Sequence, residues 1–160
     1  MEHQELLSLI RKAKDENWDK LDLSTHFIAS LPPEIGELKN LYVLDVSGTG
    51  LTSLPPEIGQ LANLRVLKAA GNQLFMLPKA IGKLKNLMSL DLSGNRLIHL
   101  PPEVGWLTNL RELSLSDNQI TSLPPEIGQL TQLKKLSKKV NEALEIFVSE
   151  GLEKAMTRFN

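Results

Sequence analysis

The sequence contains no cysteine, and several other residue classes are scarce. Without cysteine the chain can form neither a disulfide framework nor a thiolate metal site, which favours a reducing compartment, and we expect a cytoplasmic protein. Only 4% of the residues are aromatic, and the formal net charge of the 160-residue chain is −1 at pH 7. A nearly neutral chain argues against nucleic acid as a partner, because phosphate binding needs clustered lysine and arginine.

Long apolar runs are also absent. No stretch approaches the ~18 consecutive apolar residues of a membrane span, so we expect no membrane partner. The N-terminal segment MEHQELLSLIRKAKDENW is charged throughout and lacks the apolar run of a signal peptide. The hydrophobic content of 41% suits one compact domain with a core.

Motifs for catalysis or cofactor binding are missing as well. The sequence has no GxxxxGK[ST] phosphate loop, no HxxxH pattern and no nucleophile elbow. Its three histidines, His3, His26 and His99, are scattered along the chain. We therefore expect no enzymatic activity, no cofactor and no metal site.

The main feature of the sequence is one six-residue motif that is repeated along the chain. LPPEIG stands at 31–36, 54–59 and 123–128, with the near copies LPKAIG at 77–82 and LPPEVG at 100–105. The first leucines follow one another at 23 residues (54 − 31, 77 − 54, 100 − 77, 123 − 100). A fixed period between 20 and 50 residues is typical of a solenoid, in which stacked units bury the apolar side chains that one unit cannot bury alone.

A second pattern, L-x-x-L-x-L-x-x-N-x-L, precedes each of the later phrases, as in LMSLDLSGNRL. Its middle alternates apolar and polar residues, which is the period of a β-strand. Asn72, Asn95 and Asn118 follow the strand, where an inward-facing amide can bond free backbone groups of the neighbouring coil. Thr49 and His26 take this place in the first two repeats. We therefore expect an incomplete asparagine ladder and a buried, hydrogen-bonding His26.

The LPPEIG motif predicts the structure of the segment that leads from one strand back to the next. Pro55 and Pro56 cannot continue a central strand ladder, but proline fits the first turn of a helix. Ile58, Leu61 and Leu64 then recur at a spacing of three, which a short helix or 3₁₀ turn places on one inward side. Each unit is therefore predicted to contain one strand, one turn and one short helical return.

This combination resembles the leucine-rich repeat family over residues 18 to 136. The variant LPPEIGxLxxLxxLxLxxNxL is similar to the Ras-group intracellular repeats and to the repeat arrays of bacterial Roco proteins. The segment IRKAKDENWDKLDLS is similar to the entry into those bacterial arrays. The resemblance implies an α/β fold, a right-handed solenoid with a concave parallel β-sheet and short helical or 3₁₀ returns on the convex side. It also implies binding of another protein, usually on the concave face.

We expect a single domain of five full repeat units with a helical cap at each end. Apolar residues at helical spacing predict a helix over residues 3 to 15, within an N-terminal cap of residues 1–17, and Trp18 is expected to close the first coil. Residues 137–160 show the apolar spacing of an amphipathic helix and are predicted as the C-terminal cap. Their excess of apolar side chains, including Phe147 and Met156, predicts self-association.

Two surfaces are candidate partner-binding sites. On the concave face, Val43 and Val66 form an apolar centre, and Lys68 is expected to lie between two aspartates and offset both. Interfaces use aromatic and arginine anchors with a polar rim. The candidate residues on this face are Tyr42, Val43, Asp45, Arg65, Val66, Lys68, Met88 and Asp91.

The second candidate is a lateral apolar patch, where repeats three and four carry large side chains in place of small polar ones. Phe75, Met76 and Ile98 follow the asparagine turn, and Trp106 follows the repeat glycine. An exposed apolar patch marks an interaction site or a liability. The sequence leaves open whether Trp106 and the other three residues meet.

The sequence as a whole predicts a protein–protein interaction module, acting in signalling. Two alternatives stay open. The chain is either the recognition fragment of a larger multidomain protein, such as a Roco-type GTPase, or an idealised structural scaffold with no natural ligand. The near-identical LPPEIG copies favour the scaffold, whereas the irregular residues of the lateral patch argue against it.

Overall fold

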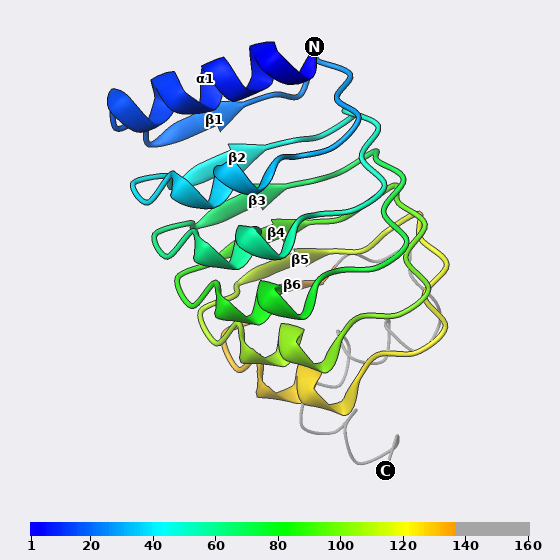
Figure 1. Ribbon diagram of the computed structural model, residues 1–160. Helices are drawn as coiled ribbons and strands as arrows, with labels where there is room; N and C mark the ends of the chain where they lie inside the picture. Colours follow the sequence, from blue (N-terminus) through cyan, green and yellow to red (C-terminus); the bar gives the residue numbers. More distant parts are fainter. Residues whose placement is uncertain (137–160) are drawn as a thin grey trace.

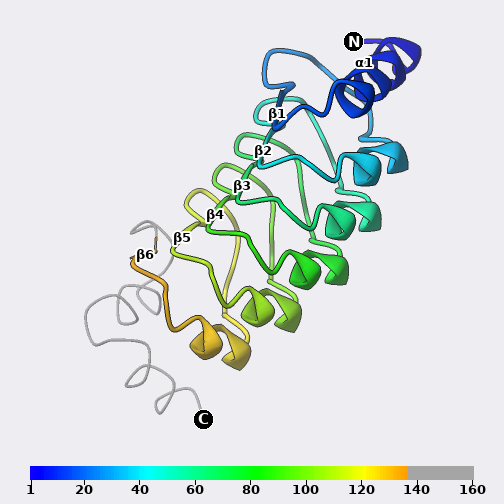
Figure 2. The same cartoon turned by 90° about the vertical axis from the view of Figure 1, so that its left-hand side faces the viewer.

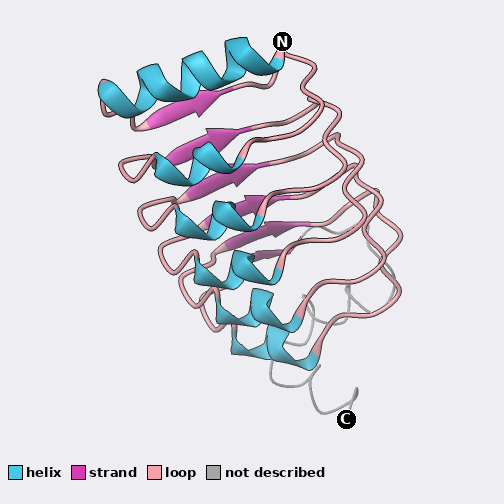
Figure 3. Ribbon diagram, viewed as in Figure 1, coloured by secondary structure: helices cyan, strands magenta, loops and turns pink. Residues whose placement is uncertain are grey.

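The computed structural model describes residues 1–136, which form a curved stack of coils (Figure 1). Each coil contains a strand, a loop, a 3₁₀ turn and a second loop that leads to the next strand (Figure 3). The strands are β1 (Lys20–Asp22), β2 (Val43–Asp45), β3 (Val66–Lys68), β4 (Ser89–Asp91), β5 (Glu112–Ser114) and β6 (Lys135–Leu136). The 3₁₀ turns are η1 (Pro33–Glu37), η2 (Pro56–Gln60), η3 (Lys79–Lys83), η4 (Pro102–Trp106) and η5 (Pro125–Gln129).

The six strands form one parallel sheet in chain order. Residues one repeat apart are direct partners, so that Val43 pairs with Val66 and Leu44 with Leu67. The sheet lies on the inner side of the curved stack and the 3₁₀ turns lie on the outer side (Figure 2). A 3₁₀ turn with its side chains is wider than a strand, so stacking similar coils bends the stack toward the sheet. The predicted concave sheet and its 3₁₀ returns are confirmed.

The core is a column of aliphatic side chains that runs through every coil. The leucine in the middle of β3, Leu67, is fully buried between strand and turn, as are Ile58 and Leu64 of the predicted inward row. Because the same positions are apolar in every unit, each coil covers its neighbour and the column is continuous.

One end of this column is closed by the helix α1 (His3–Asp15), which confirms the helix predicted for residues 3 to 15. Leu6 and Ile10 are each only 1% exposed against the first coil. Trp18 is half-buried against the same core, with its indole N–H donating to Glu16 Oε2 at 2.8 Å. The predicted C-terminal cap and its self-association surface lie outside the described residues, and the division into two caps and five repeats stays a prediction.

The glycine of LPPEIG is required by the close contact between successive 3₁₀ turns. A Cβ atom on Gly82 would lie 2.7 Å from the Glu103 carbonyl oxygen and 2.8 Å from Cε3 of Trp106. The left-handed glycines are found elsewhere, at the ends of the strands, where Gly71 and Gly94 both have φ of 64°. The repeat glycine therefore serves packing between coils.

The predicted asparagine ladder ties the coils together where the strands end. Asn95 Nδ2 donates to the carbonyl oxygens of Ala69 and Leu92 at 2.9 Å each. Its Oδ1 accepts the N–H of Leu74 at 3.0 Å. One buried side chain thus satisfies groups of its own coil and of the preceding coil, which the strands leave free.

The ladder begins at Thr49, and the prediction for His26 is wrong. Thr49 is fully buried, its hydroxyl donates to the Val46 carbonyl oxygen at 2.8 Å, and its N–H donates to Asn72 Oδ1 at 3.1 Å. His26 is exposed, with Nδ1 3.4 Å from the Thr25 hydroxyl. The physical reason lies in the neighbouring element. The ladder needs free carbonyl groups of a preceding coil. The element that precedes the first coil is α1, whose carbonyl groups are bonded within the helix, so His26 has no acceptor there.

Sequence reasoning missed a second asparagine ladder at the opposite edge, where each 3₁₀ turn leads into the next strand. Asn63, Asn86 and Asn109 each donate to a carbonyl oxygen of the preceding coil, at 2.8, 2.8 and 2.7 Å. The signal was the LxNL that recurs after four of the five repeat glycines. These asparagines are exposed, so water competes for their bonds.

The two ladders predict different losses of folding stability when an asparagine is replaced by alanine. We expect Asn95→Ala to lower the free energy of unfolding by roughly 2–4 kcal/mol, because it leaves several buried backbone groups without partners. Asn109→Ala is the matched control and is expected to cost only about 0.5–1 kcal/mol. Urea denaturation of both variants measures the difference, and equal losses would show that the buried ladder has no special role.

Candidate functional site

The apolar centre of the concave face consists of Val43 on β2 and Val66 on β3. The two are direct register partners on adjacent strands, and both side chains are half-buried. Lys20, Ser89 and Glu112 continue the same row on the other strands. The centre is therefore small, with polar or charged positions on both sides along the sheet.

Three predicted flanking residues lie together where the strands begin. The N–H groups of Arg65 and Val66 both donate to the Tyr42 carbonyl oxygen, at 2.9 and 3.0 Å, and the N–H of Met88 donates to the Arg65 carbonyl oxygen at 2.8 Å. The Arg65 guanidinium carbon lies 4.9 Å from the Tyr42 ring centroid, in cation–π range. The Tyr42 side chain remains 43% exposed. The structure thus brings Tyr42, Arg65 and Met88 beside the two valines.

A row of charged residues follows on the other side of the valines. Lys68 Nζ lies 3.8 Å from Asp45 Oδ2, and this pair is partly exposed. Asp91 is the register partner of Lys68, but its Oδ1 accepts the N–H and hydroxyl of Ser93 at 3.0 and 2.7 Å. Within residues 1–136 no ion pair joins Lys68 to Asp91, so the expectation that Lys68 offsets both aspartates is met by Asp45 alone.

The same serine bond recurs at the first strand and has an electrostatic effect. The Ser24 N–H donates to Asp22 Oδ1 at 3.0 Å. Hydrogen bonding by the Ser24 side chain, and next by its backbone, lowers the pKa of the Asp22 carboxyl. An Asp-x-Ser turn therefore fixes the orientation of the carboxylates at the ends of β1, β2 and β4.

The lateral patch proves to be two separate surfaces. Phe75, Met76 and Ile98 are 48%, 47% and 53% exposed in the loops that lead from the strands to the 3₁₀ turns. Trp106, 47% exposed, is the last residue of η4, at the opposite end of the turn. Its ring centroid lies 5.5 Å from Nζ of Lys85, a residue of the loop that leads from η3 into β4. The structure therefore groups Trp106 with the edge that carries Tyr42, and leaves the other three residues on the far edge.

Sequence reasoning did not single out Phe27, which has the largest exposed fraction of the large apolar residues in the described part of the chain, 72%. Its ring lies over Gly50, where a Cβ atom would come within 2.7 Å of Phe27 Cε2. The corresponding place holds Gly50 in the next repeat and Gln73, Arg96 and Gln119 after that, and the contrast of an aromatic residue with glycine and polar residues was the available signal.

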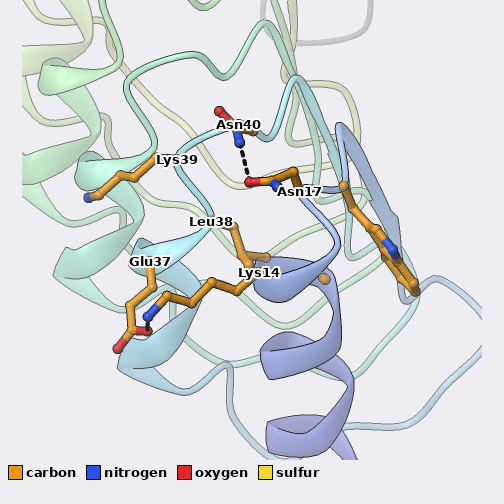
Figure 4. A pocket seen from close by; sticks show the side chains of 8 residues that line it. Lys14, Asn17, Glu37, Leu38, Lys39 and Asn40 are labelled. Atoms are coloured by element: carbon orange, nitrogen blue, oxygen red, sulfur yellow. Dashed lines mark hydrogen bonds and ion pairs between the residues drawn. The ribbon is translucent and has the colours of Figure 1, made fainter.

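A small hollow of about 260 Å³ lies between the end of α1 and the loop after η1 (Figure 4). Its polar side chains pair with one another: Lys14 Nζ lies 2.6 Å from Glu37 Oε2, and Asn40 Nδ2 donates to Asn17 Oδ1 at 2.8 Å. These contacts join the N-terminal helix to the first coil, so the hollow is a seam between two elements.

The part of the chain that the structure describes contains neither a metal-binding cluster nor a membrane-spanning helix. No group of three or more histidine, aspartate or glutamate side chains among these residues is placed to hold a metal ion. None of the described helices is both long enough and apolar enough to cross a membrane.

A parallel sheet with 3₁₀ returns and an asparagine ladder defines a leucine-rich-repeat solenoid. The family described as "leucine-rich repeat region" matches residues 20–92 and 57–156, and the chain belongs to the leucine-rich repeat family. No curated protein matches the chain.

Solved structures similar to this chain include proteins of bacteria and plants. A leucine-rich repeat protein of Leptospira interrogans is 42% identical with a TM-score of 0.69, over 70% of this chain and 29% of that one. The ectodomain of the Arabidopsis thaliana receptor kinase GASSHO1/SCHENGEN3, in complex with CASPARIAN STRIP INTEGRITY FACTOR 2, is 39% identical with a TM-score of 0.69, over 78% and 16%. The plant peptide hormone receptor RGFR1, in complex with RGF2, is 33% identical with a TM-score of 0.65, over 79% and 22%. The chain thus spans less than a third of each of these proteins.

The seam between α1 and the first coil predicts a pH dependence. The hydrogen bond and ion pair with Lys14 lower the pKa of Glu37 below its ordinary 4.5, and the same contacts raise the pKa of Lys14 above 10.5. Glu37 therefore contributes stability that is fully present above pH 4.5 and is lost as the pH falls through its lower folded pKa.

We accordingly expect Glu37→Gln to lower the thermal midpoint slightly at neutral pH and to have no effect in strong acid. Both groups are exposed, so the effect is small. Thermal unfolding followed by circular dichroism at several pH values, with exposed Gln129→Glu as a control, measures it. A difference from the parent that stays constant down to strong acid would contradict the assignment.

Proposed function

We propose that this chain is a protein-binding module that holds its partner on the concave face of the sheet. The observation that carries the proposal is the cluster of Val43, Val66, Tyr42, Arg65 and Met88, assembled on three adjacent coils. Tyrosine and arginine beside apolar residues, with charges at the rim, are typical of the residues that dominate protein interfaces.

The rigidity of the coils supports the same role. Each side chain of the cluster stands on a strand or strand edge whose backbone is bonded to both neighbouring coils. A preformed surface loses little conformational freedom on binding, so more of the contact energy appears as affinity. Two plant receptors with this fold support binding of a protein or peptide: GASSHO1/SCHENGEN3 in complex with CASPARIAN STRIP INTEGRITY FACTOR 2, and the peptide hormone receptor RGFR1 in complex with RGF2.

Other parts of the functional prediction remain proposals. A non-catalytic role is consistent with the family and with an open, shallow sheet face. A place in signalling and the likeness to Ras-group and Roco repeats remain predictions. Cytoplasmic localisation also remains a prediction, because the ectodomain of a plant membrane receptor kinase shares the fold.

The two alternative interpretations differ in what they say of the partner. As the recognition fragment of a larger protein, the chain would bind through the same cluster while a further domain acts. As a bare scaffold it would bind nothing. The exposed aromatic residues that break the repeat pattern, such as Tyr42 and Trp106, favour a binding role over a bare scaffold.

The proposal is tested by affinity capture from a lysate of the source cells, read by mass spectrometry. The parent is compared with Val43→Glu/Val66→Glu and with the control Thr52→Glu/Thr121→Glu, which adds the same charge at exposed positions on the far edge. Circular dichroism and thermal midpoints first establish that both variants fold.

We expect a protein that the parent and the control retain and the valine variant loses, with at least a tenfold reduction in the captured amount. Equal retention by all three forms would move the site away from the concave face. No retained protein at all would favour the scaffold.

A further inference from the structure

The charges of this nearly neutral chain are segregated. We define the return edge as the segments that begin at a repeat glycine and lead from η2, η3, η4 and η5 toward the next strand. These segments are residues 59–65, 82–88, 105–111 and 128–134. These segments contain no aspartate or glutamate, whereas the equivalent loop after η1, residues 36–42, contains Glu37 and is not part of the return edge. The return edge carries the cations Arg65, Lys83, Lys85, Arg111 and Lys134. Since the whole chain has a net charge of −1, the return edge stands out as a basic strip.

The cations of this strip have no carboxylate partners in the described part of the chain. Ion pairs within residues 1–136 are Lys14–Glu37, Lys68–Asp45 and Lys135–Glu112, and none includes a cation of the return edge. All five are exposed. Their charge is therefore available to a partner.

Two aromatic rings lie on the same edge of the stack, each with a cation over its face. Tyr42 lies in the loop from η1 to β2, and its ring centroid is 4.9 Å from the guanidinium carbon of Arg65. Trp106 lies at the end of η4, and its ring centroid is 5.5 Å from Nζ of Lys85. Lys85 Nζ also donates to the Trp106 carbonyl oxygen at 3.2 Å, which holds the lysine beside the ring. The rings are 43% and 47% exposed, so they add apolar contact area to the basic strip.

We propose that the return edge binds an acidic protein segment that also carries aliphatic side chains. Carboxylates of that segment meet the cations, while its aliphatic groups cover Met88, Trp106 and the neighbouring ring of Tyr42, which adjoins Arg65. The inference rests on the proposed function in taking the partner to be a protein, and it adds the chemistry and the edge by which that partner is recognised.

Protein is favoured over nucleic acid by the density of charge. The strip presents only one or two cations per coil, whereas double-stranded DNA carries a negative charge every ~1.7 Å of its axis and is bound by strongly basic domains. Binding through such a strip is expected to weaken as salt rises, because exposed charges are screened within about 8 Å at 0.15 M ionic strength.

The probe is a fluorescein-labelled peptide of repeating Glu-Leu-Ser units, followed by fluorescence anisotropy. A Gln-Leu-Ser peptide of the same length tests the need for carboxylates, and a labelled single-stranded oligonucleotide tests nucleic acid. The variant is Arg65→Gln/Arg111→Gln/Lys134→Gln. The control is Arg11→Gln/Lys79→Gln/Arg96→Gln, which removes the same charge from exposed positions outside the return edge.

We expect the acidic peptide to bind more tightly than the glutamine peptide, and the return-edge variant to lose about tenfold in affinity, the sum of three exposed charge pairs of ordinary strength. The control variant should lose less than about twofold. Equal losses in the two variants, equal binding of the two peptides, or tighter binding of the oligonucleotide would each overturn the proposal.

The outcome is separable from that of the capture experiment. If the acidic peptide fails to bind while a captured protein is still lost with Val43→Glu/Val66→Glu, the return-edge proposal is wrong and the concave-face proposal stands. If the peptide binds as expected and the valine variant retains every captured protein, the return edge is the binding surface and the concave-face proposal is wrong.

Discussion

The structure depends on one constraint: no coil can satisfy its own backbone. Each strand is only two or three residues long, and the chain then turns away from the sheet. From the third coil on, the groups left free at that turn are bonded by an asparagine that reaches into the preceding coil. Because Asn72, Asn95 and Asn118 make the same bond to the preceding coil, successive coils stack at one fixed spacing, and the register of the sheet and the rows of surface residues repeat with it.

This constraint also explains why the surface is informative. The buried and turn positions are dictated by the stacking, so LPPEIG recurs for reasons of packing: proline starts the 3₁₀ turn, isoleucine fills the core, and glycine admits the next coil. The outward positions are free of these demands. Where Tyr42, Trp106 or the cations of the return edge break the pattern, packing does not require them.

Much of the architecture follows from sequence because the period is the same everywhere. The helix over residues 3–15, the strands, the inward row of Ile58, Leu61 and Leu64, and the pairing of Val43 with Val66 all follow from aligning one repeat on the next. Tyr42, Arg65 and Met88 come together for the same reason, since they hold one position in successive repeats.

The wrong, undecided and missed points arise where a residue's surroundings depend on something other than the repeat. His26 has α1 as its neighbour in place of a coil, so the ladder has no acceptor to offer it. The placing of Trp106 depends on which end of the 3₁₀ turn it leaves, and the LxNL asparagines show their role only when successive coils are stacked in space. In each case the missing information is the geometry between neighbouring elements.

The central claim is that the concave face and its return edge form the contact surface, while the outer 3₁₀ side only supports it. Lysine acetylation footprinting of the chain, alone and with its captured partner, tests this most directly because lysines stand on each surface. The account predicts that the partner protects Lys68, Lys85 and Lys134 and leaves Lys79, on η3, as reactive as before. Protection of Lys79 with unchanged reactivity at the other three would contradict it.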